Sequence, residues 1–125
     1  SLVLFSACSK NEIVIYNQAT EQIVFVFRGE QHTVSSGFKY VMDKDIPNGT
    51  YEYGTTVTIP SGACYNVEEN LSGTISFQRS ETRYVFYYAS VFDSCYNFNV
   101  NISSTDPKNP LTKNNSSLKT LALVK

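Results

Sequence analysis

The sequence predicts an all-β domain built as an antiparallel β-sandwich, and three observations support this. Short runs rich in Val, Ile, Phe and Tyr alternate with clusters of Gly, Pro, Asn and Ser, as expected of strands and turns. No stretch has the apolar spacing of an amphipathic helix. Residues 95–103 alternate strictly, which predicts an inward row of Tyr96, Phe98, Val100 and Ile102 and an outward row of Asn97, Asn99 and Asn101.

The first strands are expected at 12–17 and 22–28, joined by a polar turn at 18–21. Residues 22–28 are apolar on both faces, which predicts a central strand covered on both sides. Gly29 and Glu30 should end it. We expect a short edge strand at 31–35 and a weakly alternating one at 37–43.

The clearest turn lies at 46–51, where Pro47 presets φ and Asn48 and Gly49 tolerate positive φ. A strand should then run over 50–59, past Gly54, and end at residues 60–62. The segment Pro47-Asn48-Gly49-Thr50-Tyr51 is similar to the Pro-x-Gly-Thr-Tyr corner of prealbumin-like and other Ig-type bacterial sandwich domains. That resemblance implies an Ig-like or prealbumin-like sandwich.

In the second half we expect a strand end at 64–67, a turn at 68–70, and strands at 73–79, 83–92 and 95–103. Asp93 and Ser94 form the tight connection between the last two. Residues 103–117 are rich in Ser, Thr, Asn and Pro and predict a polar loop. Residues 118–124 are apolar enough for a last strand, which either pairs back into its own sheet or pairs with another chain by strand exchange.

The N-terminal residues 2–10 are an apolar run, then small Ser6 and Ala7, then Cys8, then polar residues. This pattern resembles the lipobox of bacterial lipoproteins. The resemblance implies that residues 1–7 end a signal peptide, that Cys8 carries lipid, that 8–12 form a tether and that 13–125 form one sandwich domain. Residues 9–12 are similar to the tether of surface lipoproteins of Bacteroidetes. The protein would be an outer-membrane lipoprotein of the cell envelope, on the surface or the periplasmic side; the alternative is an ordinary first strand ending in a buried cysteine.

With Cys8 assigned to lipid, Cys64 and Cys95 remain as an even pair in an oxidising compartment, which favours a disulfide over two buried free thiols. A zinc site is not expected, because neither cysteine belongs to a Cys-x-x-Cys pair and the single histidine is distant. We therefore expect no metal and no cofactor.

The net charge of −1, with scattered Lys and Arg, argues against a nucleic-acid partner and leaves the lipid anchor as the expected membrane contact. Catalysis is not expected either. Ser35, His32 and Asp43 show no nucleophile turn, and His32 is expected to be a solvated loop residue. Glu68 and Glu69 would point to opposite faces of a strand, and residues 43–45 lack the oxygen ligands of a calcium loop.

The sequence instead favours a non-catalytic binding or structural module whose partner is a protein or a glycan. Along 84–89, one face carries Tyr84, Phe86 and Tyr88 and could form an exposed stacking surface. Tyr51 and Tyr53 are a second candidate patch. The sequence favours a different reading of 83–92, a central strand buried on both faces, because Trp, the commonest residue of stacking surfaces, is absent.

One alternative function rests on Ser36-Gly37-Phe38-Lys39-Tyr40, which is similar to the Ser-Gly-x-x-Tyr motif of membrane-bound inhibitors of c-type lysozyme. The resemblance implies a periplasmic inhibitor that inserts a loop into the lysozyme cleft through Ser36, Lys39 and Tyr40. The later Trp-containing motif of that family has no match, and this chain has more strands than that barrel needs. The simpler reading of the segment is an ordinary turn that leads into a strand.

Overall fold

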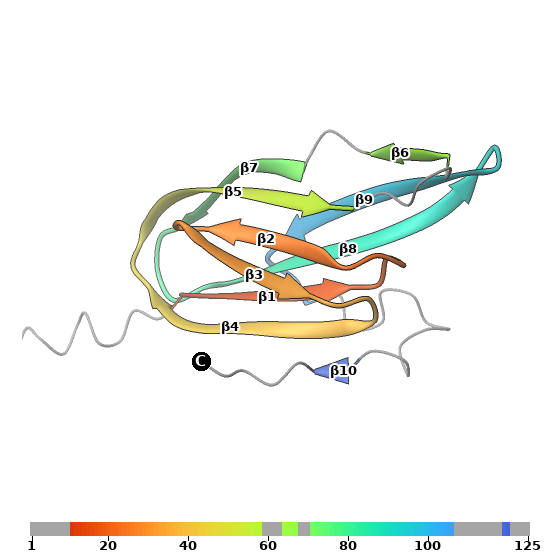
Figure 1. Cartoon of the computed structure of the whole chain (residues 1–125). Helices are drawn as coiled ribbons and strands as arrows, with labels where there is room; N and C mark the ends of the chain where they lie inside the picture. The colour runs from red at the N-terminus through yellow and green to blue at the C-terminus, as the bar shows by residue number, and fades with distance from the viewer. Residues whose placement is uncertain (1–10, 59–63, 68–70, 107–118, 121–125) are drawn as a thin grey trace, which may run out of the picture.

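The computed structural model describes residues 11–58, 64–67, 71–106 and 119–120, which form strands joined by turns (Figure 1). The strands in these ranges are β1 (Asn11–Asn17), β2 (Ile23–Phe27), β3 (Glu30–Val34), β4 (Phe38–Ile46), β5 (Gly49–Val57), β6 (Tyr65–Val67), β7 (Ser72–Phe77), β8 (Thr82–Phe92), β9 (Cys95–Ser103) and β10 (Lys119–Thr120). The described ranges contain no helix of the length and apolarity needed to cross a membrane.

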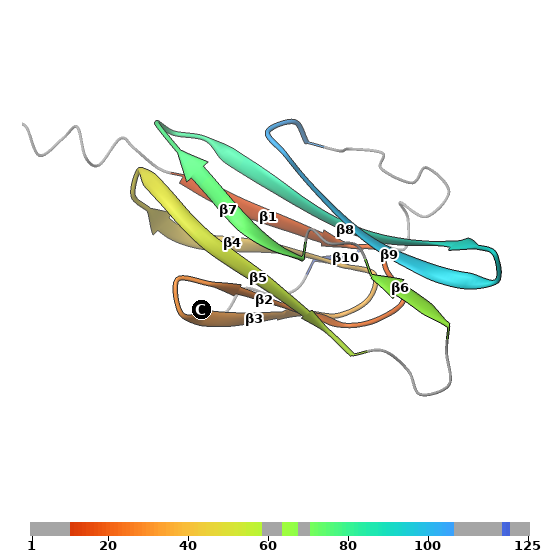
Figure 2. The same ribbon diagram turned by 90° about the horizontal axis from the view of Figure 1, so that it is seen from above.

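The strands form two packed sheets, which confirms the all-β sandwich (Figure 2). A six-stranded sheet has the order β10-β4-β1-β8-β9-β6, and a four-stranded sheet has the order β3-β2-β5-β7. The prediction of purely antiparallel sheets is wrong, because β1 pairs in parallel with β8, β4 with β10, and β6 with β9. Parallel neighbours need a long crossover connection, and between β1 and β8 the chain forms the whole four-stranded sheet before it returns.

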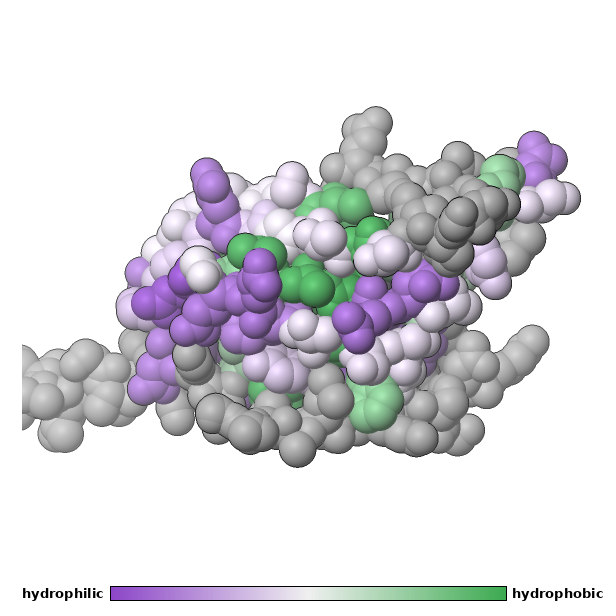
Figure 3. Space-filling view, viewed as in Figure 1, coloured by the Kyte–Doolittle hydropathy of each residue, from purple (hydrophilic) through white to green (hydrophobic). Residues whose placement is uncertain are grey.

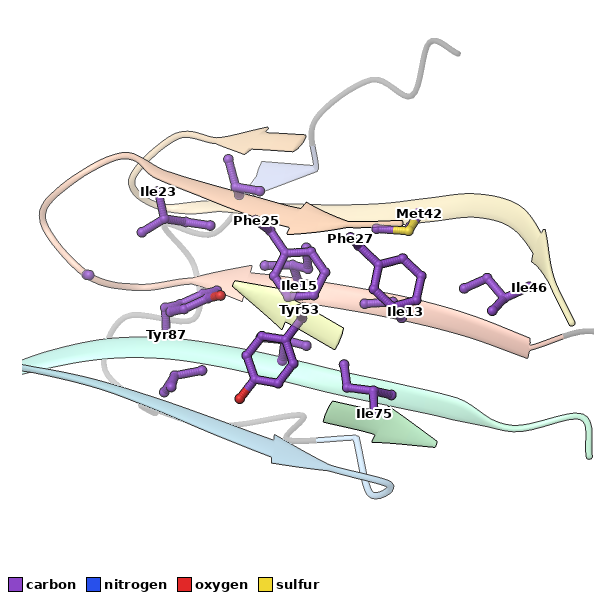
Figure 4. Packing of buried hydrophobic residues seen from close by; sticks show 14 of the residues in the cluster. Ile13, Ile15, Ile23, Phe25, Phe27, Met42, Ile46, Tyr53, Ile75 and Tyr87 are labelled. Atoms are coloured by element: carbon purple, nitrogen blue, oxygen red, sulfur yellow. The ribbon is translucent and has the colours of Figure 1, made fainter. Parts of the chain in front are cut away.

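The core lies between the sheets and is built from alternate residues of each strand. Phe25 and Phe27 of β2 and Tyr53 of β5 point toward Ile13 and Ile15 of β1, as Figure 4 shows. Further members of this cluster are Ile23, Val34, Met42, Ile46, Ile75, Phe77, Val85, Tyr87, Phe98 and Val100. Each large apolar side chain that is fully buried here contributes roughly 1.5–3 kcal/mol to the free energy of unfolding.

The second strand lies inside the four-stranded sheet, as predicted, but it is covered on one face only. Ile23, Phe25 and Phe27 are buried, whereas Val24 and Val26 are partly exposed on the outer face. Their cross-strand neighbours include Thr33 and Thr56. Apolar surface gathers over β2 and β5 at the middle of Figure 3, with hydrophilic residues on both sides.

Two hairpins have the tight turns that a twisted antiparallel pair favours. Arg28 and Gly29, between β2 and β3, have φ of 52° and 79°, and Asp93 and Ser94, between β8 and β9, have φ of 58° and 64°. Positive φ at both central residues is the type I′ pattern, whose twist matches that of the strands. Between β4 and β5, Gly49 takes positive φ, as predicted, but Asn48 does not.

Several boundaries differ from those expected. The bounds of β9 match the prediction, but Tyr96 of its inward row is exposed. β4 extends to Ile46. β1 begins at Asn11, so Asn11, which the sequence placed in the tether, belongs to the sheet, as does Glu12, the expected start of the strand.

Buried asparagines hold both ends of β1. Asn11 donates to the carbonyl of Ile46 (2.7 Å) and to Asn48 Oδ1 (3.0 Å), and it accepts a bond from the backbone N–H of Glu81 (3.0 Å). Asn17 donates to the carbonyls of Glu21 and Val34 and accepts from the N–H of Ala19. Asparagine has a low propensity for strands, but at each end of β1 its side chain stabilises the fold because it forms hydrogen bonds with buried backbone groups of neighbouring segments.

Some predicted features lie outside the described residues. They are the lipobox with Cys8, the turns expected at 60–62 and 68–70, and most of the polar loop at 103–117.

Candidate binding face

The aromatic residues of β8 predicted to share a face do so on the outside of the six-stranded sheet. Val85 and Tyr87 point into the core and are fully buried, so the alternation of β8 turns Tyr84, Phe86 and Tyr88 outward. There they join β1 and β4 in a second cluster, which we call the tyrosine face. It consists of Val14, Tyr16, Val41, Tyr84, Phe86 and Tyr88.

The tyrosine face is partly exposed. Phe86 is 8% exposed and Tyr16 6%, whereas Tyr84 and Tyr88 on either side of Phe86 along β8 are exposed to an intermediate degree. Phe86 stacks on Tyr88 at 5.2 Å between ring centroids and meets Tyr16 edge-on at 6.4 Å. β8 is therefore a central strand with Phe86 buried on its outer face, as the sequence favoured, and the rings of Tyr84 and Tyr88 on either side stay partly exposed. Their aromatic neighbours hold these rings in place.

Charged groups lie at the Tyr16 end of this face. The Tyr16 hydroxyl donates to Asp106 Oδ1 at 2.8 Å, and Lys39 Nζ lies 5.5 Å from the centre of the Tyr16 ring. Burial raises the pKa of Tyr16, and the bond to Asp106 and its negative charge raise it further. Burial also raises the pKa of Tyr84, and the carboxylates of Asp106 and Glu12 act in the same direction. Both tyrosines therefore keep their hydroxyl protons, and so can donate hydrogen bonds, at neutral pH.

A row of asparagines runs beside the rings on β9. The antiparallel register pairs Phe86 with Asn101 and Tyr88 with Asn99, so each amide shares a face with the ring opposite. Asn101 is exposed, and Asn97 and Asn99 are partly exposed. The sequence predicted that the asparagines point outward, and the two-residue turn at Asp93 and Ser94 is the signal from which this register could have been derived.

The second predicted patch, Tyr51 and Tyr53, is not an exposed surface. Both side chains pack on the inner face of β5, where Tyr53 stacks on Phe25 at 5.8 Å and is 9% exposed. Burial raises the pKa of Tyr53. Tyr51 packs on Phe27, and its hydroxyl donates to the carbonyl of Pro47 at 2.6 Å. The opposite row of β5 contains Glu52 and threonines, which a core does not accept, so the alternation itself favoured the tyrosines as the inner row, and the prediction of an exposed patch here was wrong.

The structure does not bring Ser36, Lys39 and Tyr40 together on one loop. The Ser36 hydroxyl donates to the carbonyl of Ala19 at 2.6 Å. Lys39 lies over Tyr16 on the outer face, whereas Tyr40 packs against the core and bonds His32. Phe38, Lys39 and Tyr40 are already part of β4, so alternation sends Lys39 and Tyr40 to opposite faces.

His32 is a buried strand residue and not a solvated one. It lies in β3 with 9% exposure; its Nδ1 is 2.9 Å from the Tyr40 hydroxyl, and its Nε2 is 3.6 Å from Glu30 Oε1. It lines a cleft of about 370 Å³ between the sheet edges, together with Phe27, Arg28, Glu30, Met42, Asp45 and Ile46. Ser35 follows the strand, and the side chain of Asp43 lies outside the described set. Within that set, no group of three His, Cys, Asp or Glu residues is placed to hold a metal ion.

Cys64 and Cys95 form the predicted disulfide, with Cα atoms 4.7 Å apart. The bridge fastens β6 to the start of β9, beside the parallel pairing of these strands. Of the last predicted strand, residues 119–120 are described as β10, which pairs in parallel with Phe38 and Lys39 of its own chain. Of the two alternatives, these two residues therefore pair with their own sheet and not with another chain.

No protein-family model matches this chain, and no curated protein matches it.

Proposed function

We propose that this protein is a lipid-anchored lipoprotein of the bacterial cell envelope that acts as a non-catalytic binding module through the tyrosine face. The observation that carries the proposal is the placement of Tyr84 and Tyr88 on the outer surface of the sheet. Both are partly exposed, and they lie on either side of Phe86, which packs against Tyr16 and Tyr88. Partly exposed rings with fixed orientation are efficient contact groups, because little side-chain entropy is lost on binding.

The finer fold belongs to the same proposal, namely an Ig-like or prealbumin-like sandwich. Its support is the Tyr51 hydroxyl, which bonds the carbonyl of Pro47 four residues upstream. A tyrosine that closes a corner in this way is a recurring feature of Ig-type sandwiches.

The anchor would orient the domain. Two residues separate Cys8 from Asn11, the first residue of β1, so a lipidated Cys8 lies within about 11 Å of the sheet even when the chain is fully extended. Asn11 bonds the β4–β5 turn and the segment before β8, so this end of the sandwich would face the membrane. The β8–β9 turn would then point away from the membrane, with the tyrosine face exposed along the side of the domain.

Anchoring is tested in the source bacterium with an alkyne-bearing palmitate. We expect the protein to take up the label and to lose it in Cys8→Ser, while Cys64→Ser retains it. Label on Cys8→Ser, or none on the native protein, would remove the lipoprotein part of the proposal. Protease treatment of intact cells then separates the surface from the periplasmic side.

Binding is tested with the purified full chain carrying Cys8→Ser, added to isolated cell envelopes. We expect saturable retention that the double variant Tyr84→Ala/Tyr88→Ala loses and that Thr33→Ala, on the outer face of the other sheet, keeps. Equal retention of all three proteins would rule out the tyrosine face as the binding surface.

A further inference from the structure

The asparagine row of β9 and the rings of β8 form one continuous surface. Asn97, Asn99 and Asn101 are successive outward residues, and we call them the asparagine ladder. The register places Asn99 opposite Tyr88 and Asn101 opposite Phe86. Directly opposite side chains in an antiparallel pair have Cβ atoms about 4.5–5.5 Å apart, so the amides of Asn99 and Asn101 each lie beside a ring. Asn97 is paired with Ser90 instead.

The amide of Asn99 is held in place by the backbone of its own strand. The side-chain N–H of Asn99 donates to the backbone carbonyl of Asn97 at 3.1 Å, which fixes the direction of that amide. Its second N–H and its carbonyl oxygen are not used by this bond. A sugar ring presents hydroxyls that both donate and accept, together with a C–H face that packs on an aromatic ring, and so matches both rows.

The same surface is poorly suited to other occupants. The outward residues of β8 from 84 to 88 and of β9 from 97 to 103 are uncharged Tyr, Phe, Asn and Ser. Lys39 and Asp106, at the Tyr16 end, have opposite charges, so the surface has no cluster of positive charge to attract a nucleic acid or an anionic polymer. An apolar protein surface would offer no partner to the amide groups of Asn99 and Asn101 that it buries, which costs about 1–3 kcal/mol for each unsatisfied group. An uncharged ligand rich in hydroxyl groups avoids both penalties.

We propose that the ligand of the tyrosine face is a neutral glycan chain, whose sugar rings stack on Tyr84 and Tyr88 while its hydroxyls bond the asparagine ladder. The proposal rests on the binding role of the tyrosine face and adds the chemical class of the ligand and three binding residues. Asn97 to Asn101 span about 14 Å along the strand, which suits a chain better than a single sugar.

The test is an NMR titration of the full chain carrying Cys8→Ser with four neutral linear hexasaccharides: cellohexaose, xylohexaose, mannohexaose and maltohexaose. Hexagalacturonate serves as the charged counterpart. We expect at least one neutral hexasaccharide to shift the side-chain NH₂ signals of Asn99 and Asn101, with hexagalacturonate leaving them in place. Asn101→Ala should weaken that binding about tenfold, which corresponds to about 1.4 kcal/mol.

Thr33→Ala is the matched control, and Tyr88→Leu is the second variant, since it keeps an apolar side chain in the cluster and removes the ring. We expect Thr33→Ala to bind as the native chain does, and Tyr88→Leu to melt near it but bind more weakly. No shift with any neutral hexasaccharide at millimolar concentration, or shifts confined to residues outside β8 and β9, would overturn the inference.

The two proposals fail separately. If envelope binding depends on Tyr84 and Tyr88 but is destroyed by protease and resists periodate, the ligand is a protein, and the glycan inference falls while the binding role stands. If the tyrosine variants bind envelopes as the native chain does, the binding role itself falls.

Discussion

The hydroxyl of Tyr87 on β8 is hydrogen-bonded to the hydroxyl of Thr55 on β5, across the space between the two sheets. Tyr87 is fully buried, and burial raises its pKa. This bond provides a partner for a polar group in the core and links the strand that carries the tyrosine face to the opposite sheet.

Removing the Tyr87 hydroxyl should lower stability without disturbing the fold. We expect Tyr87→Phe to reduce the free energy of unfolding by about 1 kcal/mol, because one buried hydrogen bond is lost and the partly exposed Thr55 can bond water. Urea unfolding measures the change. Thr56→Val, on the outer face of the same strand, should have a smaller effect, and an equal loss in the two variants would contradict the role of the bond.

Asn11 should be among the most sensitive polar positions. Asn11→Ala leaves the carbonyl of Ile46 and the N–H of Glu81 without their side-chain partner, and we expect a loss of about 3 kcal/mol. Thermal melting of the variant beside Asn48→Ala tests this, since Asn48 is exposed and makes one of the same bonds. Similar losses in the two variants would show that the backbone bonds of Asn11 carry little energy.

Glu81 should make stability depend on acid pH. Its carboxylate accepts bonds from the backbone N–H groups of Gln78 and Arg79 and pairs with Arg83, and the bond from Gln78 is the main cause that lowers the pKa of Glu81. A lowered pKa stabilises the fold above the unfolded-state value of about 4.3, and this contribution is lost as pH falls through the folded-state value.

We therefore expect Glu81→Gln to melt below the native protein at pH 7 and to approach it as the pH falls below about 4. Melting curves between pH 2 and pH 8 measure the difference, with Glu52→Gln, an exposed carboxylate of β5, as control. A difference that stays constant over this pH range would show that the charge of Glu81 is not its cause.

The Cys64–Cys95 disulfide should be a large single contribution to stability. It joins residues 31 positions apart, and in the chain-entropy model such a loop corresponds to about 3–4 kcal/mol. We expect Cys64→Ser/Cys95→Ser to lose this amount in urea unfolding, and reduction of the native chain to have the same effect. Reduction should leave the double variant unchanged; a further loss there would mean that the reductant acts elsewhere.

Much of the local structure could be read from residue order alone. The strict alternation of 95–103 predicted β9 and its outward asparagines, and the pair Asp93 and Ser94 predicted the tight turn before it. These features depend on side-chain direction and on turn conformations that a few neighbouring residues determine. The position of the asparagine ladder beside the rings of β8 could thus have been predicted from the sequence, once the register of the β8–β9 hairpin had been derived.

The faces of β8 could not be assigned in the same way. In β8, both rows of the alternation hold residues that a core accepts, so the pattern defines two faces without choosing between them. In β5, the row with Glu52 is polar, and the tyrosine row was the better candidate for the core. Tyr87 lies inward and Tyr88 outward because of the strands that pack against them.

The sequence by itself determined most strands, the tight turn at Asp93 and Ser94 and the all-β class, since each depends on residues close together in the chain. Only the tertiary structure decided that β1 lies in parallel beside β8, that His32 is buried against Tyr40, and that Tyr16 and Asp106 meet at the end of the tyrosine face. Those contacts join residues distant in the chain, and their geometry follows from how the two sheets close over one core.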